Sequence, residues 1–165
     1  MSLLGLKGTM SEYELSLMRQ RGLAARDSKA SRGEYRFTLP PGLCWSEAGK
    51  IEIDPDEHVA ETVRLVLAKF RELGSARQTF LWLRAADIKM PVVLRNVEVC
   101  KLVWKAPAYH AVMQILHNPL YAGAYAFGRK RTRVVDGHAR KVSGFDKPME
   151  EWNVLIKDHH PGYIS

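Results

Sequence analysis

The chain has 165 residues, of which 46% are hydrophobic and 26% charged, and its formal net charge is +7. This length suits one domain, or one domain with an appendage, that can bury its own core. The basic balance favours an anionic partner such as nucleic acid, although many basic proteins have none. Cys44 and Cys100 lie far apart and outside any CxxC, so a thiolate zinc site has no support and a reduced, intracellular setting is the default. No stretch resembles a membrane span or a secretory signal.

The first predicted element is a long helix over residues 5–33. Ser11 and Glu14 form an S-x-x-E capping box, which is typical of a helix start, and Gly33 is a plausible stop signal. Apolar residues recur at three- and four-residue spacing before a basic end. One interpretation is a solvated amphipathic helix packed on its own domain. The other is a connector whose upstream half belongs to a separate domain.

A β-like section and two helices come next. Alternation predicts a strand over 35–39, and two more over 43–45 and 51–53 should form a small hairpin. Asp54 as N-cap and Pro55 at the first helical position predict a helix that ends at Gly74. Ser75 caps a third helix at once, to about Ala86. Such a tight join is the outline of a helix-turn-helix unit, and many other helical hairpins share it.

The last third of the chain is predicted to be mainly β. Residues 90–105 suit a short hairpin or an extended arm, and Pro107 opens a fourth helix to about His117. A strand over 123–135, a turn at Asp136–Gly137, a returning strand over 140–145 and a last strand over 153–156 follow. The tail 158–165 looks like the entry to another helix. The predicted fold class is α+β: a long N-terminal helix, then a compact domain of about three core helices with short antiparallel hairpins.

No self-contained catalytic set is present in the sequence. No Walker loop, HExxH, G-x-S-x-G or strand-borne G-x-G-x-x-G occurs. His159 and His160 are neighbours that should point to opposite faces of an extended segment, so no metal site is predicted. We expect no catalytic residue, no metal and no cofactor in this chain. A small hydrolase or metal enzyme using the two histidines stays open as a rival.

Basic residues give the clearer signal. Those around the Asp136–Gly137 turn would form a basic β-ribbon that can lie along phosphates, unless it is only an exposed, charged hairpin. Polar positions early in the fourth helix could meet base edges in a major groove, or could simply flank a core helix. The four tryptophans are expected in the core.

Four segments together resemble the large serine recombinases, a family of resolvase- and invertase-like proteins. They are LKGTMSEYELSLMRQRGLAARDSKASRG, FTLPPGL, the helix from Ile53-Asp54-Pro55 to Gly74-Ser75, and Trp104 followed by ILHNPLYAG. The last is the most specific. Leu43 stands where an aromatic residue is common. The family's catalytic serine and arginines would lie in an upstream domain, so none is assigned here, and the two cysteines cannot supply a zinc ribbon.

The resemblance implies a division into residues 1–33, a connector helix from an absent catalytic domain, and residues 34–165, a DNA-binding recombinase domain. It implies double-stranded DNA and self-association of the full-length protein as partners, with no membrane, in a prokaryotic cytoplasm at the nucleoid. The alternative is a stand-alone, repressor-like DNA-binding module with a helical dimerisation arm. The residues expected at a subunit contact are Met10, Tyr13, Leu17 and Met18. The residues expected to contact DNA are Arg26, Lys29, Arg32, Arg36, Lys105, His110, Gln114, Arg129, Lys130, Arg131 and Arg133.

Overall fold

The computed structural model describes residues 3–95, 100–135 and 138–164, with side chains over 11–94, 101–131 and 147–164. The chain divides into two compact units, Met1–Tyr35 and Arg36–Ser165. Four helices and short antiparallel hairpins make up the described residues, so the α+β prediction is confirmed. No helix among them is long and apolar enough to cross a membrane.

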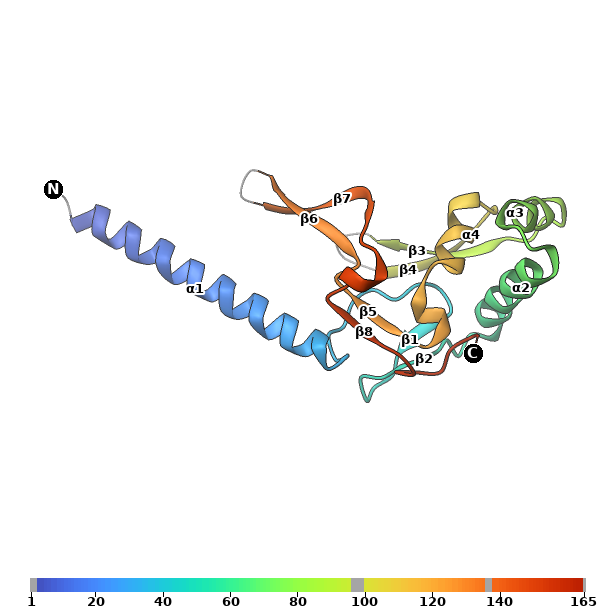
Figure 1. The fold of residues 1–165 in the computed structure, drawn as a ribbon, viewed down its shortest axis with the longest axis horizontal. Helices are drawn as coiled ribbons and strands as arrows, with labels where there is room; N and C mark the ends of the chain where they lie inside the picture. Colours follow the sequence, from blue (N-terminus) through green and yellow to red (C-terminus); the bar gives the residue numbers. More distant parts are fainter. Residues whose placement is uncertain (1–2, 96–99, 136–137, 165) are drawn as a thin grey trace. The chain divides into compact units, whose positions relative to one another are not determined.

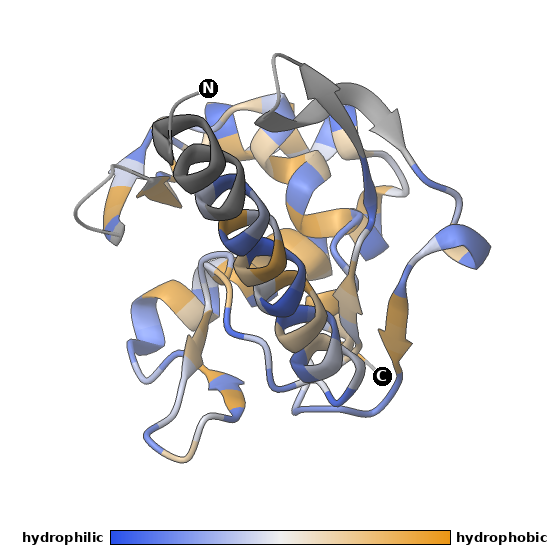
Figure 2. Ribbon diagram, turned by 90° about the vertical axis from the view of Figure 1, so that its left-hand side faces the viewer, coloured by the Kyte–Doolittle hydropathy of each residue, from blue (hydrophilic) through white to orange (hydrophobic). Residues whose placement is uncertain are grey.

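The first unit is the helix α1 (Leu3–Ser31), drawn in blue in Figure 1. It begins eight residues before Ser11, so the prediction that Ser11 is the N-cap is wrong. The stop at Gly33 is confirmed: its φ of 73° is left-handed, and its N–H donates to the Ala30 carbonyl at 2.9 Å. The ribbon of α1 is mostly hydrophilic with short hydrophobic stretches (Figure 2).

The second unit begins with irregular backbone and a small hairpin, β1 (Leu43–Trp45) paired with β2 (Ile51–Ile53). The strand predicted over 35–39 is absent. The Phe37 carbonyl instead accepts a 2.9 Å bond from Trp45 Nε1, and the Phe37 ring packs on Tyr125. This segment is therefore held by side chains rather than by a partner strand.

Two helices follow, α2 (Glu57–Leu73) and α3 (Ala76–Ala85). The N-cap of α2 is Asp56 and not Asp54, because Asp56 accepts from the His58 N–H while Asp54 accepts from the Asp56 N–H, each at 3.0 Å. The join at Gly74 and Ser75 is as predicted: Gly74 is left-handed, and the Ser75 hydroxyl caps α3.

The hairpin β3 (Met90–Arg95) and β4 (Cys100–Lys105) confirms the prediction for 90–105. The helix α4 (Tyr109–Leu116) starts two residues after the predicted Pro107, and a short 3-10 helix η1 (Pro119–Ala122) follows it. Helices α2, α3 and α4 contact one another, as Figure 1 shows at the right.

The strand predicted over 123–135 is two strands, β5 (Tyr125–Phe127) and β6 (Lys130–Val135). Between them Gly128 has a φ of 75°, which interrupts the extended backbone. β6 pairs with β7 (His138–Asp146), and the predicted turn at 136–137 lies outside the described residues. After a 3-10 turn η2 (Met149–Glu151), β8 (Val154–Ile156) pairs with β5. Residues 157–164 contain no helix.

One hydrophobic core holds the second unit together. It joins α2, α3 and α4 to the strands β1, β2, β3 and β5, and Trp45 and Trp82 pack against it as partly buried residues. Its buried members are Leu39, Leu43, Ile51, Val63, Val66, Leu83, Met90, Val112, Ile115, Leu120, Tyr121 and Tyr125.

Candidate nucleic-acid interface

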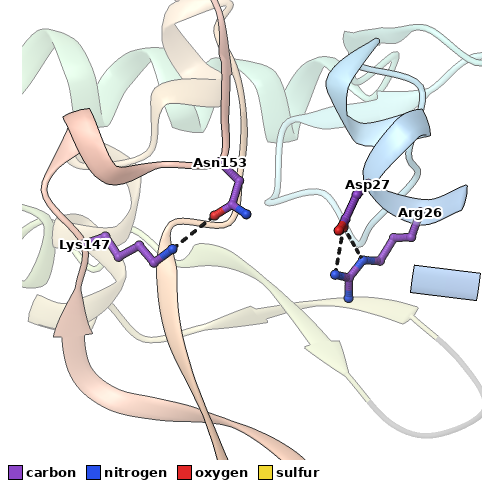
Figure 3. Close-up of polar contacts among 4 residues, drawn as sticks. All are labelled: Arg26, Asp27, Lys147 and Asn153. Carbon is purple, nitrogen blue, oxygen red and sulfur yellow. Dashed lines mark hydrogen bonds and ion pairs between the residues drawn. The ribbon is translucent and has the colours of Figure 1, made fainter. Parts of the chain in front are cut away.

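The basic end of α1 and the turn that follows it carry three of the predicted DNA contacts. Arg26 pairs with its neighbour Asp27 through two bonds of 2.8 and 3.0 Å (Figure 3). Arg32 donates to Glu34 at 3.0 Å and to the Ser28 hydroxyl at 2.8 Å. Lys29 is exposed. These local pairs are solvent-accessible and weak, so they do not prevent the cations from contacting phosphate.

Two of the apolar residues predicted to contact another subunit are exposed. The Tyr13 and Met18 side chains are 67% and 69% exposed, and Leu17 is half-buried. The side chain of Met10 lies outside the described residues. Leu15 and Leu23 are also about half exposed, at 50% and 51%. The helix therefore presents apolar side chains on more than one side.

In the second unit, Arg36 is exposed with its guanidinium 5.7 Å from the centroid of the Trp45 ring. It lies at the edge of an open pocket of about 580 Å³ that is mainly apolar, lined among others by Phe37, Leu43 and Leu102. Cys44 also lines it, and burial, with smaller effects of Asp54 and Glu52, raises the pKa of the Cys44 thiol. A raised pKa lowers the fraction of the reactive thiolate at neutral pH.

The predicted basic ribbon has two different kinds of arginine. Arg129 is half-buried and donates to Asn118 Oδ1 and to the His117 carbonyl, each at 3.3 Å, while its guanidinium lies 5.2 Å from the Trp152 ring centroid. These contacts stabilise the fold around the end of α4. Lys130 and Arg131 are exposed, and Arg131 has a loose 3.6 Å pair with Glu151. The side chain of Arg133 lies outside the described residues.

Lys105 is exposed at the end of β4, opposite Met90 in the strand register. His110 and Gln114 are exposed on the outer side of α4, whose inner side buries Val112 and Ile115. Tyr109 at the start of α4 is 47% exposed and meets Phe80 of α3 edge-on, with ring centroids 6.2 Å apart. The structure thus brings the first turn of α4 beside α3.

The Asn118–Gly123 segment of the ILHNPLYAG motif has a structural role. Asn118 Oδ1 caps η1 by accepting from the Leu120 N–H at 3.2 Å. Gly123 has a φ of 73°, and a Cβ there would lie 2.5 Å from the His160 carbonyl oxygen. The Gly123 carbonyl in turn accepts from the His159 N–H at 2.9 Å, and the Tyr121 carbonyl from the Tyr163 N–H at 2.7 Å. We call these contacts between residues 118–123 and 158–164 the C-terminal clasp.

The two histidines of the clasp contact each other, so the prediction that they point to opposite faces is wrong. Asp158 has a φ of 54°, which breaks the extended backbone before them. His160 Nε2 lies 2.8 Å from the Leu120 carbonyl oxygen and must donate to it, so Nδ1 of a neutral His160 accepts. His159 Nδ1, 3.1 Å away, then donates.

Burial lowers the pKa of His160; the bond to the Leu120 carbonyl opposes this shift and His159 adds to it. Among the described residues, no group of three or more His, Cys, Asp or Glu is placed to hold a metal ion. The paired imidazoles are accounted for by their bonds within the clasp.

Sequence reasoning missed the outer face of α3. Arg77, Gln78 and Arg84 are exposed there together with Leu81, which is 49% exposed. The signal was present in ARQTFLWLRA, because positions 77, 81 and 84 follow the i, i+4, i+7 spacing of one helix face.

Comparison with known proteins identifies the family. The sequence model described as Recombinase matches residues 57–165, which is two thirds of the chain. The chain belongs to the Recombinase family. The matched Recombinase segment starts at the first residue of α2 and includes α3, α4 and the clasp.

A relative in Sinorhizobium fredii (strain NBRC 101917 / NGR234), the uncharacterized protein y4bA/y4pH, is 41% identical over 170 residues. The alignment covers 99% of this chain and 23% of that protein, so the chain spans about a quarter of the relative's length. No solved structure matches the chain.

Proposed function

We propose that this chain is the DNA-binding portion of a site-specific serine recombinase. The observation that carries the proposal is the Recombinase match over residues 57–165, the segment that holds most of the exposed cations discussed above. Residues 1–33 would be the connector helix from a resolvase-type catalytic domain, and residues 34–165 the domain that binds duplex DNA. Self-association would use the exposed apolar side chains of α1.

In the proposed parent protein, a serine hydroxyl of the catalytic domain attacks a DNA phosphodiester. A phosphoseryl bond forms, a deoxyribose hydroxyl leaves, and the reverse attack by a hydroxyl of another strand rejoins the DNA and releases the serine. The residues of this chain contribute binding and positioning. Lys130, Arg131 and Lys105 would neutralise phosphates, which releases counterions from the duplex. The helices would carry the contacts to base edges.

A repressor-like module with a helical dimerisation arm is the second candidate. The observation that favours it is the exposure of Tyr13 and Met18 on α1, since a dimerisation arm needs only such a surface and no catalytic domain. An open reading frame upstream that encodes a serine-centred catalytic domain would favour the recombinase, and its absence the repressor.

A mobility-shift titration of the chain on duplex DNA across salt concentrations tests the binding claim. We expect log Kobs to fall linearly with log salt, with a slope of about −0.9 for each phosphate neutralised. No shift at low ionic strength, or a shift independent of salt, would refute it. DNA cleavage by the isolated chain would contradict the assignment of catalysis to another domain.

A further inference from the structure

The outer face of α3 combines basic, amide and apolar side chains. A helix face that meets only water does not need this mixture. Arg77, Leu81 and Arg84 lie in one row, with Gln78 beside them. The helix has two cations and no acidic residue. Leu81 stands half exposed between the two arginines, so part of its apolar surface has no cover from within the described residues. The row suits a partner that offers both acceptor atoms and methyl groups.

The inner side fixes α3 firmly. Thr79 and Leu83 are fully buried, and the Thr79 hydroxyl donates to the Ser75 carbonyl at 2.9 Å. At the join, the Gly74 N–H donates to the Phe70 carbonyl at 2.8 Å, and Ser75 caps the next helix at once. Figure 1 shows α2 and α3 as neighbouring helices connected by this short turn. Because the inner side and the turn are fixed, the four outer side chains project from a rigid support.

We infer that α3 is the recognition helix of this domain and reads base edges in the major groove through Arg77, Gln78 and Leu81. This inference rests on the proposed function and adds the residues that set its sequence preference. Arginine matches the O6 and N7 acceptors of guanine, glutamine matches N6 and N7 of adenine, and an apolar side chain contacts the thymine methyl. Arg84, at the last turn, supplies a phosphate contact at the groove edge.

The neighbouring helix α4 is the competing reader. Its outer residues His110 and Gln114 are polar, but the helix YHAVMQIL contains no lysine or arginine. The acidic residues that flank α3 are Glu72, which is paired with Lys69 at 2.6 Å, and Asp87, which comes after the end of the helix. Charge complementarity with DNA therefore favours α3 over α4 as the helix in the groove.

Selection from a random duplex pool, followed by sequencing of the bound DNA, tests this inference on the whole chain. The wild type should enrich a preferred site. Gln78→Ala and Arg77→Ala should each lose discrimination at one or two adjacent base pairs, by about tenfold or more, while the other positions keep their preference. Arg71→Ala is the matched control, because Arg71 is exposed in the last turn of α2 and not on the outer face of α3. It should leave the selected sequence unchanged.

The results of this selection experiment separate the inference about α3 from the proposed function. If the wild type binds no duplex at all, the proposed function fails together with this inference. If it binds and the α3 variants select the wild-type sequence, only the inference fails. A change of selected sequence in His110→Ala or Gln114→Ala but not in Gln78→Ala would assign the reading to α4. Equal melting temperatures of wild type and variants would show that folding is unaffected, as expected for exposed side chains.

Discussion

The hydroxyl of Tyr121 donates a 2.7 Å hydrogen bond to the backbone carbonyl of Pro41, eighty residues earlier in the chain. Tyr121 is 1% exposed, and burial, with a smaller effect of Tyr163, raises the pKa of its phenol. The hydroxyl of Tyr163 similarly donates to the Gly42 carbonyl. These two hydrogen bonds connect the irregular segment 36–42 to residues 118–123 and to residues 158–164. The first residues of the second unit are therefore held against its last described residues.

Tyr121→Phe should lower the free energy of unfolding by about 1–2 kcal/mol, because it removes one hydrogen bond and leaves a part-buried carbonyl without this donor. Urea denaturation followed by circular dichroism measures the change. Tyr13→Phe makes the same substitution at a tyrosine that is 67% exposed, and should change stability by less than about 0.5 kcal/mol. Equal losses in the two variants would contradict the role of the Pro41 bond.

Gly123→Ala should be more damaging than Gly74→Ala. Both glycines are left-handed, with φ of 73° and 67°, so alanine costs about 1 kcal/mol at either position. Only at Gly123 would the new Cβ also meet backbone, namely the His160 carbonyl oxygen, whereas nothing lies within 4 Å at Gly74. We expect an additional loss of about 1–3 kcal/mol at Gly123, measured by thermal or urea unfolding. Similar losses at both positions would mean that the clasp opens at little cost.

The clasp should also make stability depend on pH. The pKa of His160 is lower in the folded chain than in the unfolded chain, where it is about 6.5, so the unfolded state binds the proton more readily. Stability from this group is complete above pH 6.5 and is lost as pH falls through and below that value. Unfolding free energies measured from pH 8 to pH 5 should fall less steeply for His160→Gln than for the wild type. The difference in unfolding free energy between the wild type and His160→Gln at pH 8 gives the cost of the substitution itself. Parallel curves would exclude His160 as the source.

Local chemistry made some elements predictable. Gly74 and Ser75 fix a helix end and a helix start within two residues, and both were predicted correctly because each acts on its own turn. The cap of α2 was misplaced because Asp54 and Asp56 are both good caps, and the bond between them decides which one begins the helix.

Elements that depend on partners far away in the sequence were harder to predict. Residues 35–39 alternate like a strand, but no neighbouring strand pairs with them in the described structure. The partner of β5 is β8, nearly thirty residues later, and nothing in the sequence between them specifies that pairing. In the candidate site, exposed cations such as Lys29, Lys105 and Arg131 were predicted from charge alone, whereas Arg77 and Arg84 on α3 were not. The structural role of Arg129 could not be predicted, because its partners Asn118 and Trp152 come from different parts of the sequence.

Arg131→Ala and Arg129→Ala should separate DNA contact from fold stability. Arg131 is exposed and its pair with Glu151 is loose, so alanine should change stability by less than about 0.5 kcal/mol. If Arg131 meets a phosphate, the variant should bind all DNA sequences more weakly and reduce the magnitude of the salt slope by about 1. Arg129→Ala should instead lower stability by about 1–3 kcal/mol through its two lost bonds and its contact with Trp152. A stable Arg129→Ala and a destabilised Arg131→Ala would reverse these assignments.

Self-association through α1 should depend on one face of that helix. Replacing Tyr13 and Met18 together by serine should weaken dimerisation at least about tenfold, because each large apolar side chain gains about 1.5–3 kcal/mol when it is fully buried. Sedimentation equilibrium over a range of protein concentrations measures the dissociation constant. Leu23→Ser is the matched control: Leu23 is 51% exposed, and at about 100° per residue it lies about 80° around the helix from Tyr13 and about 140° from Met18, outside the arc that holds the predicted contact residues. If the Leu23 variant weakens association as much as the double variant, the contact is not confined to the predicted face. If the wild type is monomeric at every concentration, α1 alone does not drive association.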